Sequence, residues 1–239
     1  MIEHLLPAAV RGSELFVDPA DPAAEAELYP VEREQIARSV PKRRSEYAGA
    51  RACARAAMAA LGIDPAPLPK GPGGGPQWPG GVVGSITHTE GYRAAAVAFS
   101  LGVRAVGVDA ERHGPLPPGV LRTVALPAER DWLEAVGAGD DPRGRDRPAG
   151  MDGVHWDRLL FSAKETTYKA WHPLTGRWLG FEDAHITVTP GPAVGAAPAG
   201  EFVSRLLVPG HTRTGDALTE IRGRWIVDRG FVVTAAVVM

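Results

Sequence analysis

The sequence has almost no cysteine and no long apolar run. Its single cysteine, Cys53, excludes a disulfide within the chain and a cysteine-based structural zinc site. Cys53 lies in the alanine-rich stretch RACARAAMAAL, where we expect a small buried helical residue. No stretch approaches the roughly 18 consecutive apolar residues of a membrane span. The opening MIEHLLPAAV lacks a basic region before its short apolar run, so it does not predict a signal peptide. We expect a cytoplasmic protein with no membrane partner.

An excess of charge of either sign is also absent. The formal net charge is −2, so the chain has no strong overall field that would favour nucleic acid as a partner. Hydrophobic residues make up 44% and charged residues 23%, as in ordinary globular proteins. The length of 239 residues allows one large domain or two small ones.

The first half of the chain reads as helix followed by strands. The pattern is helical from Val31 to Leu61, and Gly62 is a natural C-terminal stop. Prolines and glycines exclude regular structure at residues 65–81. A strand-like period then predicts three strands: VVGSITHT, YRAAAVAFS and AVGVDAE. Gly91 lies between the first two and predicts a hairpin turn.

The second half repeats this order. Residues 113–130 are proline-rich, and a short helix is predicted to start near Pro127. Residues 137–153 have the composition of a loop. A helix around FSAKETTYKAW (residues 161–171) follows, with Asp157 as its predicted N-cap. The chain ends in predicted antiparallel strands: FEDAHITVT, EFVSRLLVP and GRWIVDRGFVVTAAVV, the last with a turn at Asp228-Arg229-Gly230. We therefore predict an α+β protein of two similar α/β subdomains, residues 1–112 and 113–239.

Two acidic residues in AVGVDAERH could hold a metal ion. Asp109 and Glu111 point to the same face of the predicted strand, about 7 Å apart. A hard divalent cation prefers such carboxylate oxygens, completed by water and phosphate. The alternative is a solvated strand end, since most carboxylates are exposed.

The predicted helix around residue 165 carries a third carboxylate between two lysines. Glu165 and Lys169 are spaced i, i+4, so they could form an exposed ion pair of little energetic value. Alternatively, Glu165 completes a metal shell while Lys164 and Lys169 meet phosphate.

Basic and glycine-rich elements precede these carboxylates. They could supply phosphate donors and allow close backbone approach; they are Arg43, Arg44, Arg51, Lys70, His88 and Gly73 to Gly75. The glycine-rich segment is neither a P-loop nor a dinucleotide fingerprint. Taken singly, each has an ordinary alternative: a solvated arginine, a connecting loop or a structural histidine.

The order of these motifs resembles the surfactin-type (Sfp-type) 4′-phosphopantetheinyl transferases. The series is RRSEYAGARACAR, PKGPGGGPQWP, GSITHT, GVDAE and FSAKETTYKAW. It looks closest to the branch of enterobactin-synthase component D and the actinobacterial enzymes of siderophore and lipid synthesis. The likeness extends from about residue 40 to the C-terminus, and G-[IV]-D-x-E followed by [FW]-[SCT]-x-K-E-x-x-x-K is specific to this family.

The resemblance implies a fold and a reaction. The two subdomains would be related by a pseudo-twofold axis, with coenzyme A in the cleft between them. The family transfers the phosphopantetheine arm of coenzyme A to a serine of an apo acyl or peptidyl carrier protein. The other product is adenosine 3′,5′-bisphosphate. The cofactor would be Mg²⁺, with Mn²⁺ as a substitute.

The resemblance also assigns residues. Asp109, Glu111 and Glu165 would hold the metal; Glu165 would be the base for the carrier serine, directly or through water; Lys169 would neutralise the pyrophosphate. The residues implied for coenzyme A are Arg43, Arg51, Lys70, Gly74, Thr87, His88, Asp109, Lys164 and Lys169. The family's usual serine before the histidine is Thr87 here, which keeps the hydroxyl. Ala110 cannot be a metal ligand, so water would take that position.

Two alternatives use the same residues. A metal-dependent phosphohydrolase would release phosphopantetheine with water as the nucleophile, and a silent binding module would tolerate Glu165→Gln. For the carrier protein we predict a contact region at residues 116–126 with Arg122. Two fused subdomains have no need to dimerise, so we expect a monomer.

Overall fold

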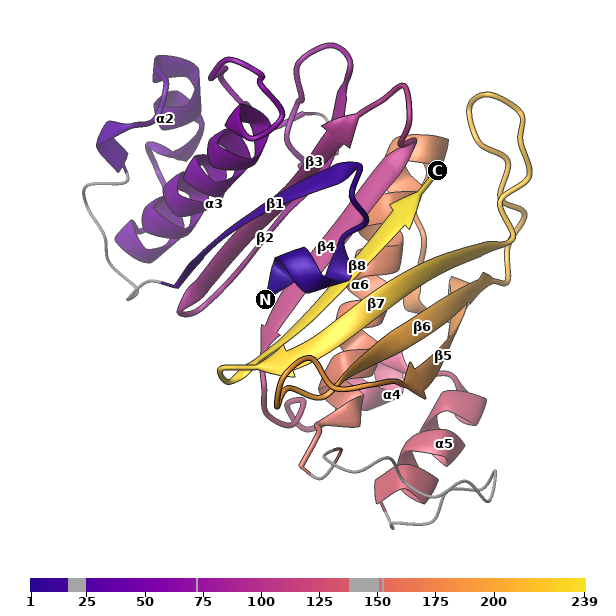
Figure 1. Ribbon diagram of the computed structural model, residues 1–239. Coiled ribbons are helices and arrows are strands. Elements are labelled where there is room, and N and C mark those ends of the chain that lie inside the picture. Colours follow the sequence, from indigo (N-terminus) through magenta and orange to yellow (C-terminus); the bar gives the residue numbers. More distant parts are fainter. Residues whose placement is uncertain (17–24, 72, 138–150, 152) are drawn as a thin grey trace.

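The computed structural model describes residues 1–16, 25–71, 73–137, 151 and 153–239. Most of the loop predicted at residues 137–153 lies outside the described residues. The chain forms two sheets, each covered by a long helix (Figure 1). The predicted α+β class is confirmed, whereas the pseudo-twofold relation stays a prediction.

The N-terminal sheet has three antiparallel strands in the order β1-β3-β2. The strands are β1 (Val10–Phe16), β2 (Val82–Thr89) and β3 (Tyr92–Phe99), and helix α3 (Pro41–Ala59) covers one face. Cys53 and Met58 of α3 pack against Ala95 and Val97 of β3. Cys53 is thus buried, as predicted. Strand β1 was not predicted.

The predicted continuous helix at 31–61 is wrong, because it is two helices. Helix α2 (Pro30–Ile36) ends before α3, which begins with Pro41 at its first turn. Proline has no N–H to donate and restricts the residue before it, so a helix breaks there but can start there. The predicted stop at Gly62 is confirmed by its φ of 76°, where a side chain would be strained.

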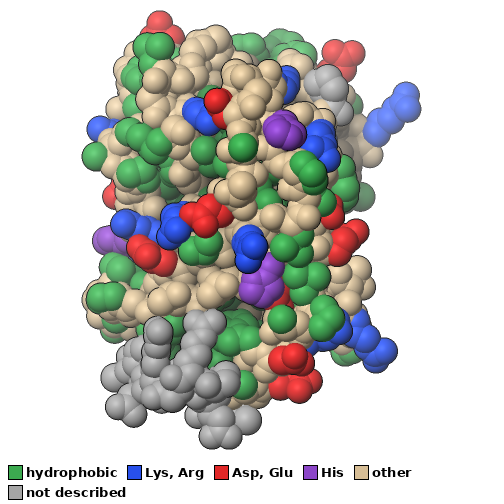
Figure 2. Space-filling model, turned by 90° about the vertical axis from the view of Figure 1, so that its right-hand side faces the viewer, with side chains coloured by type: hydrophobic (Ala, Val, Ile, Leu, Met, Phe, Trp, Pro, Cys, Tyr) green, Lys and Arg blue, Asp and Glu red, His purple; other side chains and the backbone are tan. Residues whose placement is uncertain are grey.

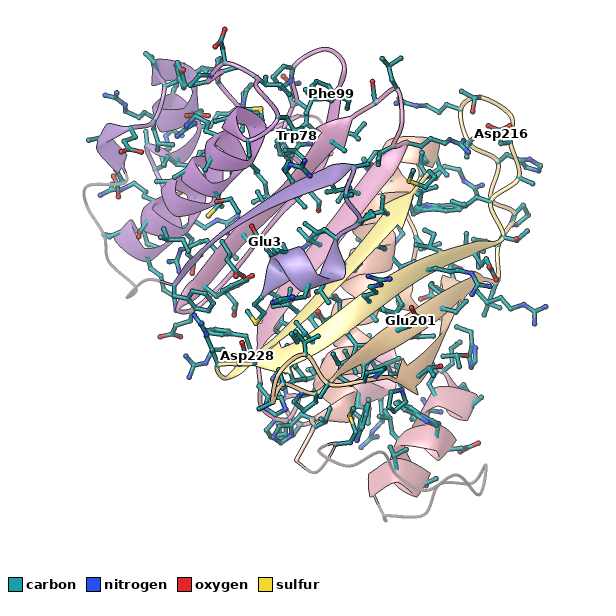
Figure 3. The ribbon with its side chains drawn as sticks, viewed as in Figure 1. Glu3, Trp78, Phe99, Glu201, Asp216 and Asp228 are labelled. Atoms are coloured by element: carbon teal, nitrogen blue, oxygen red, sulfur yellow. The ribbon has the colours of Figure 1, made fainter. Side chains whose placement is uncertain are left out.

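Both predicted hairpin turns are present. Gly91, with φ 83°, joins β2 to β3. Arg229 and Gly230, with φ 49° and 78°, join β7 to β8 at the turn that follows Asp228 (Figure 3). At the β7–β8 turn both central residues are left-handed, as in the type I′ turn that matches the twist of a two-residue hairpin.

The second sheet has five antiparallel strands in the order β4-β8-β7-β6-β5. Their bounds are β4 Ala105–Arg112, β5 Ala184–Pro190, β6 Ala199–Leu206, β7 Glu220–Asp228 and β8 Phe231–Val238. Helix α6 (Trp156–Thr175) crosses behind this sheet in Figure 1. Trp171 of α6 and Trp225 of β7 are fully buried in the core between them.

Short helices precede and follow α6 in the chain. They are η1 (Ile2–Leu5) at the N-terminus, and α4 (Val120–Val124) and α5 (Pro127–Gly137) before α6; η2 (Phe181–Asp183) follows it. The start of α5 at Pro127 is as predicted. The predicted N-cap Asp157 is wrong, since His155 is the N-cap. The Asp157 carboxylate instead accepts the backbone N–H of Leu116 at 2.8 Å and of Arg158 at 2.8 Å, because it lies one residue inside the helix.

Strand β4 lies at the seam between the two sheets. It pairs with β8, yet the N–H groups of Val108 and Ala110 donate to the hydroxyls of Ser85 and Thr87 on β2, each at 3.0 Å. Hydroxyl side chains thus replace a backbone ladder between β2 and β4. The division of the chain into residues 1–112 and 113–239 stays a prediction, since β4 is held from both sides.

Helix α6 approaches β4 closely at Gly107. A Cβ atom at this position would lie 2.2 Å from the backbone oxygen of Thr166 and 2.9 Å from the nitrogen of Ala170. We expect Gly107→Ala to lower the free energy of unfolding by about 1–3 kcal/mol or more, because overpacking forces helix and strand apart. Urea unfolding measures this, with Gly102→Ala as control, where a Cβ would meet nothing within 4 Å. Equal stability of both variants would contradict the close approach.

Among the described helices, none is long and apolar enough to cross a membrane. On the face shown in Figure 2, charged side chains of both signs are scattered between hydrophobic ones outside the grey region. This matches the small net charge of the sequence.

Candidate active site

An ion pair joins α6 to β4. The ammonium of Lys169 lies 2.7 Å from Oδ1 of Asp109 and donates to the backbone oxygen of Val108 at 3.0 Å. Asp109 is 5% exposed, so this is a partly buried charge pair. The lysine therefore reaches across to the strand instead of pairing with Glu165 along its own helix.

Hydroxyl groups hold the remaining contacts of Asp109. Ser162 of α6 donates to Oδ2 at 2.9 Å, and Thr87 of β2 lies 3.4 Å from Oδ1. Thr87 also accepts the Ala110 N–H, so its hydroxyl is occupied within the protein. Sequence reasoning missed Ser162, although it stands three residues before Glu165 in the same motif.

Two further carboxylates flank this pair. Burial and then the charge of Asp109 raise the pKa of Glu111 to about 7, although Arg158 lies 3.0 Å from its Oε2. Burial and then Asp109 also raise the pKa of Glu165, while Lys169 lowers it. The three predicted metal ligands are thus near enough for Asp109 to influence both glutamates.

The donor chemistry of these carboxylates fits a hard divalent cation, but they are not arranged as a ligand shell. In the described part of the chain, no group of three or more His, Cys, Asp or Glu residues could hold a metal ion as the side chains lie. Asp109 is paired with Lys169 and Glu111 with Arg158. A cation would relieve the crowding of negative charge that raises the pKa of Glu111 and of Glu165.

A basic cluster lies beside this group. Nη1 of Arg43 is 2.5 Å from Nε2 of His88. Glu46 lies 3.6 Å from Arg43 and 3.7 Å from Nδ1 of His88. Burial first, and then Arg43 and Lys169, lower the pKa of His88 to about 4. The imidazole is therefore neutral at pH 7, with Nε2 accepting from the guanidinium.

We expect His88 to titrate near pH 4, which is measurable from its imidazole proton signals in NMR spectra. The unfolded chain takes up this proton near the ordinary pKa of 6.5, so the contribution of His88 to stability is lost as pH falls from 6.5 toward 4. Above 6.5 the contribution is constant. His88→Gln should remove this part of the pH dependence of stability. The imidazole signal that disappears in this variant is that of His88. A midpoint at 6.5 or above would contradict the described environment.

Two more predicted residues complete the basic cluster. The Arg51 guanidinium stacks 3.4 Å from the centre of the Tyr47 ring, and the Lys70 ammonium lies 5.5 Å from the same centre. Burial lowers the pKa of Arg51 to about 10, and burial with Arg43 and Arg51 lowers the pKa of Lys70. Several cations thus share one region, as an anion site requires.

The glycine-rich loop reaches α6. Lys70 and Pro76 pair as an isolated bridge, and the loop between them turns through Gly74, with φ 81°. A Cβ atom on Gly73 would lie 2.5 Å from Cε1 of His172, one turn beyond Lys169. The loop therefore packs closely against α6 at Gly73, and the predicted approach of Gly73 to Gly75 to phosphate stays a prediction.

Lys164 does not reach the site. Its ammonium lies 2.8 Å from Oε2 of Glu129 and donates to the backbone oxygens of Phe181 and Ala184, at 2.7 and 2.9 Å. Both side chains are 1% exposed. Lys164 thus points toward α5 and β5, away from Asp109, and its predicted binding of coenzyme A stays a prediction.

Comparison with known proteins assigns the chain. Residues 31–98 match the model of the 4′-phosphopantetheinyl transferase N-terminal domain, and residues 105–208 match that of the 4′-phosphopantetheinyl transferase superfamily. The chain belongs to the 4′-phosphopantetheinyl transferase superfamily. It is therefore an enzyme that transfers 4′-phosphopantetheine from coenzyme A to carrier proteins, as the resemblance predicted.

Full-length relatives agree. The chain is 49% identical to the 4′-phosphopantetheinyl transferase Npt of Nocardia iowensis, over 98% of both chains. It is 48% identical to Svp of Streptomyces mobaraensis, over 100% of this chain and 89% of the relative. It is 49% identical to PptT of Mycobacterium tuberculosis, over 99% and 97% of the two chains.

Proposed function

We propose that the region between β4 and α6 moves 4′-phosphopantetheine from coenzyme A to a serine of an apo acyl or peptidyl carrier protein and releases adenosine 3′,5′-bisphosphate. One observation carries this proposal. The Asp109–Lys169 pair, flanked by Glu111 and Glu165, lies within electrostatic reach of the basic cluster around His88. Carboxylates for a metal and cations for phosphates are thus neighbours, which phosphoryl transfer requires.

The basic cluster would grip the nucleotide. Arg43, Arg51, Lys70 and His88 share one region, where Glu46 lies near Arg43 and His88, and Glu32 acts on Arg51. Guanidinium groups suit phosphate oxygens because they offer paired N–H donors. Gly74 would allow the backbone of the loop near the phosphates. These four side chains are our candidates for the phosphates of coenzyme A.

Asp109, Glu111 and Glu165 would hold Mg²⁺, with Mn²⁺ as a substitute. The metal supplies charge neutralisation on the pyrophosphate. Glu165 would accept the proton of the carrier serine, directly or through water, and its raised pKa makes it a better proton acceptor near neutral pH. Lys169 would stabilise negative charge on the pyrophosphate as its P–O bond breaks. Thr87 would contribute by holding Asp109.

The remaining predictions concern partners. Arg122 is exposed on α4, which fits a carrier contact at residues 116–126. A monomeric state, and location in the cytoplasm, where coenzyme A is available, are part of the same proposal.

Intact-mass analysis tests the proposed function. We expect an apo carrier protein to gain one phosphopantetheine when incubated with the enzyme, coenzyme A and Mg²⁺, and to gain none without metal. Consumption of coenzyme A with an unmodified carrier would indicate hydrolysis instead. Intact coenzyme A across several carrier classes would favour a binding module.

A further inference from the structure

A chain of buried hydroxyl groups ends at Asp109. Ser162 Oγ lies 2.9 Å from Oδ2 of Asp109 and 2.9 Å from Oγ1 of Thr234, which lies 2.7 Å from Oγ1 of Thr166. Ser162, Thr234 and Thr166 are all 0% exposed. Ser162 and Thr166 come from α6, one turn apart, and Thr234 comes from β8, directly opposite Asp109 in the sheet. The chain therefore crosses from helix to strand and returns.

The direction of these hydrogen bonds follows from their ends. The Asp109 carboxylate, paired with Lys169, accepts, so the Ser162 hydroxyl must donate to it. Its single proton is then used, and Thr234 must donate toward Ser162, to Oγ or to the backbone oxygen at 3.1 Å. Thr166 lies 2.7 Å from Oγ1 of Thr234 and also donates to the Thr234 backbone oxygen at 3.3 Å. Ser162 thus bonds the carboxylate directly, and Thr234, itself bonded to Thr166, contacts Ser162 from the strand.

We propose that the chain Thr166–Thr234–Ser162 positions Asp109 for metal binding, with Thr234 as the key positioning residue. This rests on the proposed role of Asp109 as a metal ligand. The chain fixes Oδ2 and so leaves Oδ1 facing Lys169. Groups that orient a metal ligand in this way typically affect metal affinity strongly. Thr234 is fully buried and carries no motif signal.

Direct Mn²⁺ binding tests the proposal. Free Mn²⁺ is measured by electron paramagnetic resonance with enzyme and coenzyme A present. Thr234→Val, which keeps the shape but removes the hydroxyl, should weaken Mn²⁺ binding by about tenfold. Thr234→Ser should restore it. Ser162→Ala should weaken Mn²⁺ binding at least as much as Thr234→Val does. Thr166→Val should weaken it less than either. In turnover, kcat should fall while the KM for the carrier protein stays unchanged.

Thr167→Val is the matched control. Thr167 lies on the same helix and is 0% exposed, and among the described residues its hydroxyl bonds only the oxygen of Ala163, at 2.7 Å. It should lose a similar amount of stability and leave Mn²⁺ affinity unchanged. Equal Mn²⁺ affinity in Thr234→Val and wild type would overturn the proposal, and so would an equal loss in Thr167→Val. If Thr234→Val does not fold, the Mn²⁺ affinities of Ser162→Ala and Thr234→Ser are compared instead. Equal affinity in these two variants would then overturn the proposal. Wild type that binds no Mn²⁺ would overturn the metal role itself, and with it that of the chain.

Discussion

Glu165→Gln is expected to abolish nearly all transfer while leaving coenzyme A bound. The amide cannot accept the serine proton and is a poorer metal ligand, so kcat should fall by about 10²–10⁴-fold. The basic cluster that would bind the nucleotide is untouched. Intact-mass time courses measure the rate, and calorimetric titration with coenzyme A measures the affinity.

Glu134→Gln is the control for Glu165→Gln. Glu134 is exposed on α5, and the same loss of one charge there should leave kcat unchanged. Full activity of Glu165→Gln would exclude Glu165 as base and as metal ligand. Loss of coenzyme A binding together with activity would place Glu165 in the binding site instead.

Lys164→Met is expected to destabilise the fold by about 3–5 kcal/mol, because it leaves Glu129 buried without a counter-charge. Glu129 also accepts the N–H groups of Leu126 and Ile186, so it cannot turn away to solvent. Guanidinium unfolding measures the loss. Glu129→Gln in the same chain should recover part of it, since the amide oxygen still accepts an N–H.

The double variant Lys164→Met/Glu129→Gln also separates two roles of the lysine. If Lys164 only ties α6 to α5 and β5, the folded double variant should bind coenzyme A with nearly the affinity of wild type. A large loss of affinity in a variant that has regained stability would return Lys164 to the binding site.

Local signals accounted for much of the architecture. Alternation fixed the faces of β4, so that Asp109 and Glu111 were correctly predicted to share one face. Glycines at positive φ marked both hairpins. Strand β1 escaped prediction because VRGSELF has little β-branched content and owes its conformation to pairing with β3. The break before Pro41 escaped because the helical pattern continues on both sides of it.

The site was predicted less completely, for a different reason. Motifs supplied the ionisable residues, but spacing along a helix does not say what each side chain meets. Lys164 is adjacent to Glu165 and Lys169 lies one helical turn beyond it. Lys164 is nevertheless buried against Glu129, whereas Lys169 reaches Asp109. Thr234 depends on the register of β8 against β4, which no local pattern encodes.

Because of the register between β4 and β8, enzyme activity depends on the alignment of these two strands. Asp109 faces Ser162 only because it lies opposite Thr234; a slip of one residue would turn it into the apolar core that holds Val108 and Ala110. One residue inserted in β4 before Asp109 would therefore abolish enzyme activity even if the sheet still formed. Insertions at residues 191–198, between β5 and β6, leave that alignment intact, so this loop is where the chain can lengthen without losing its chemistry.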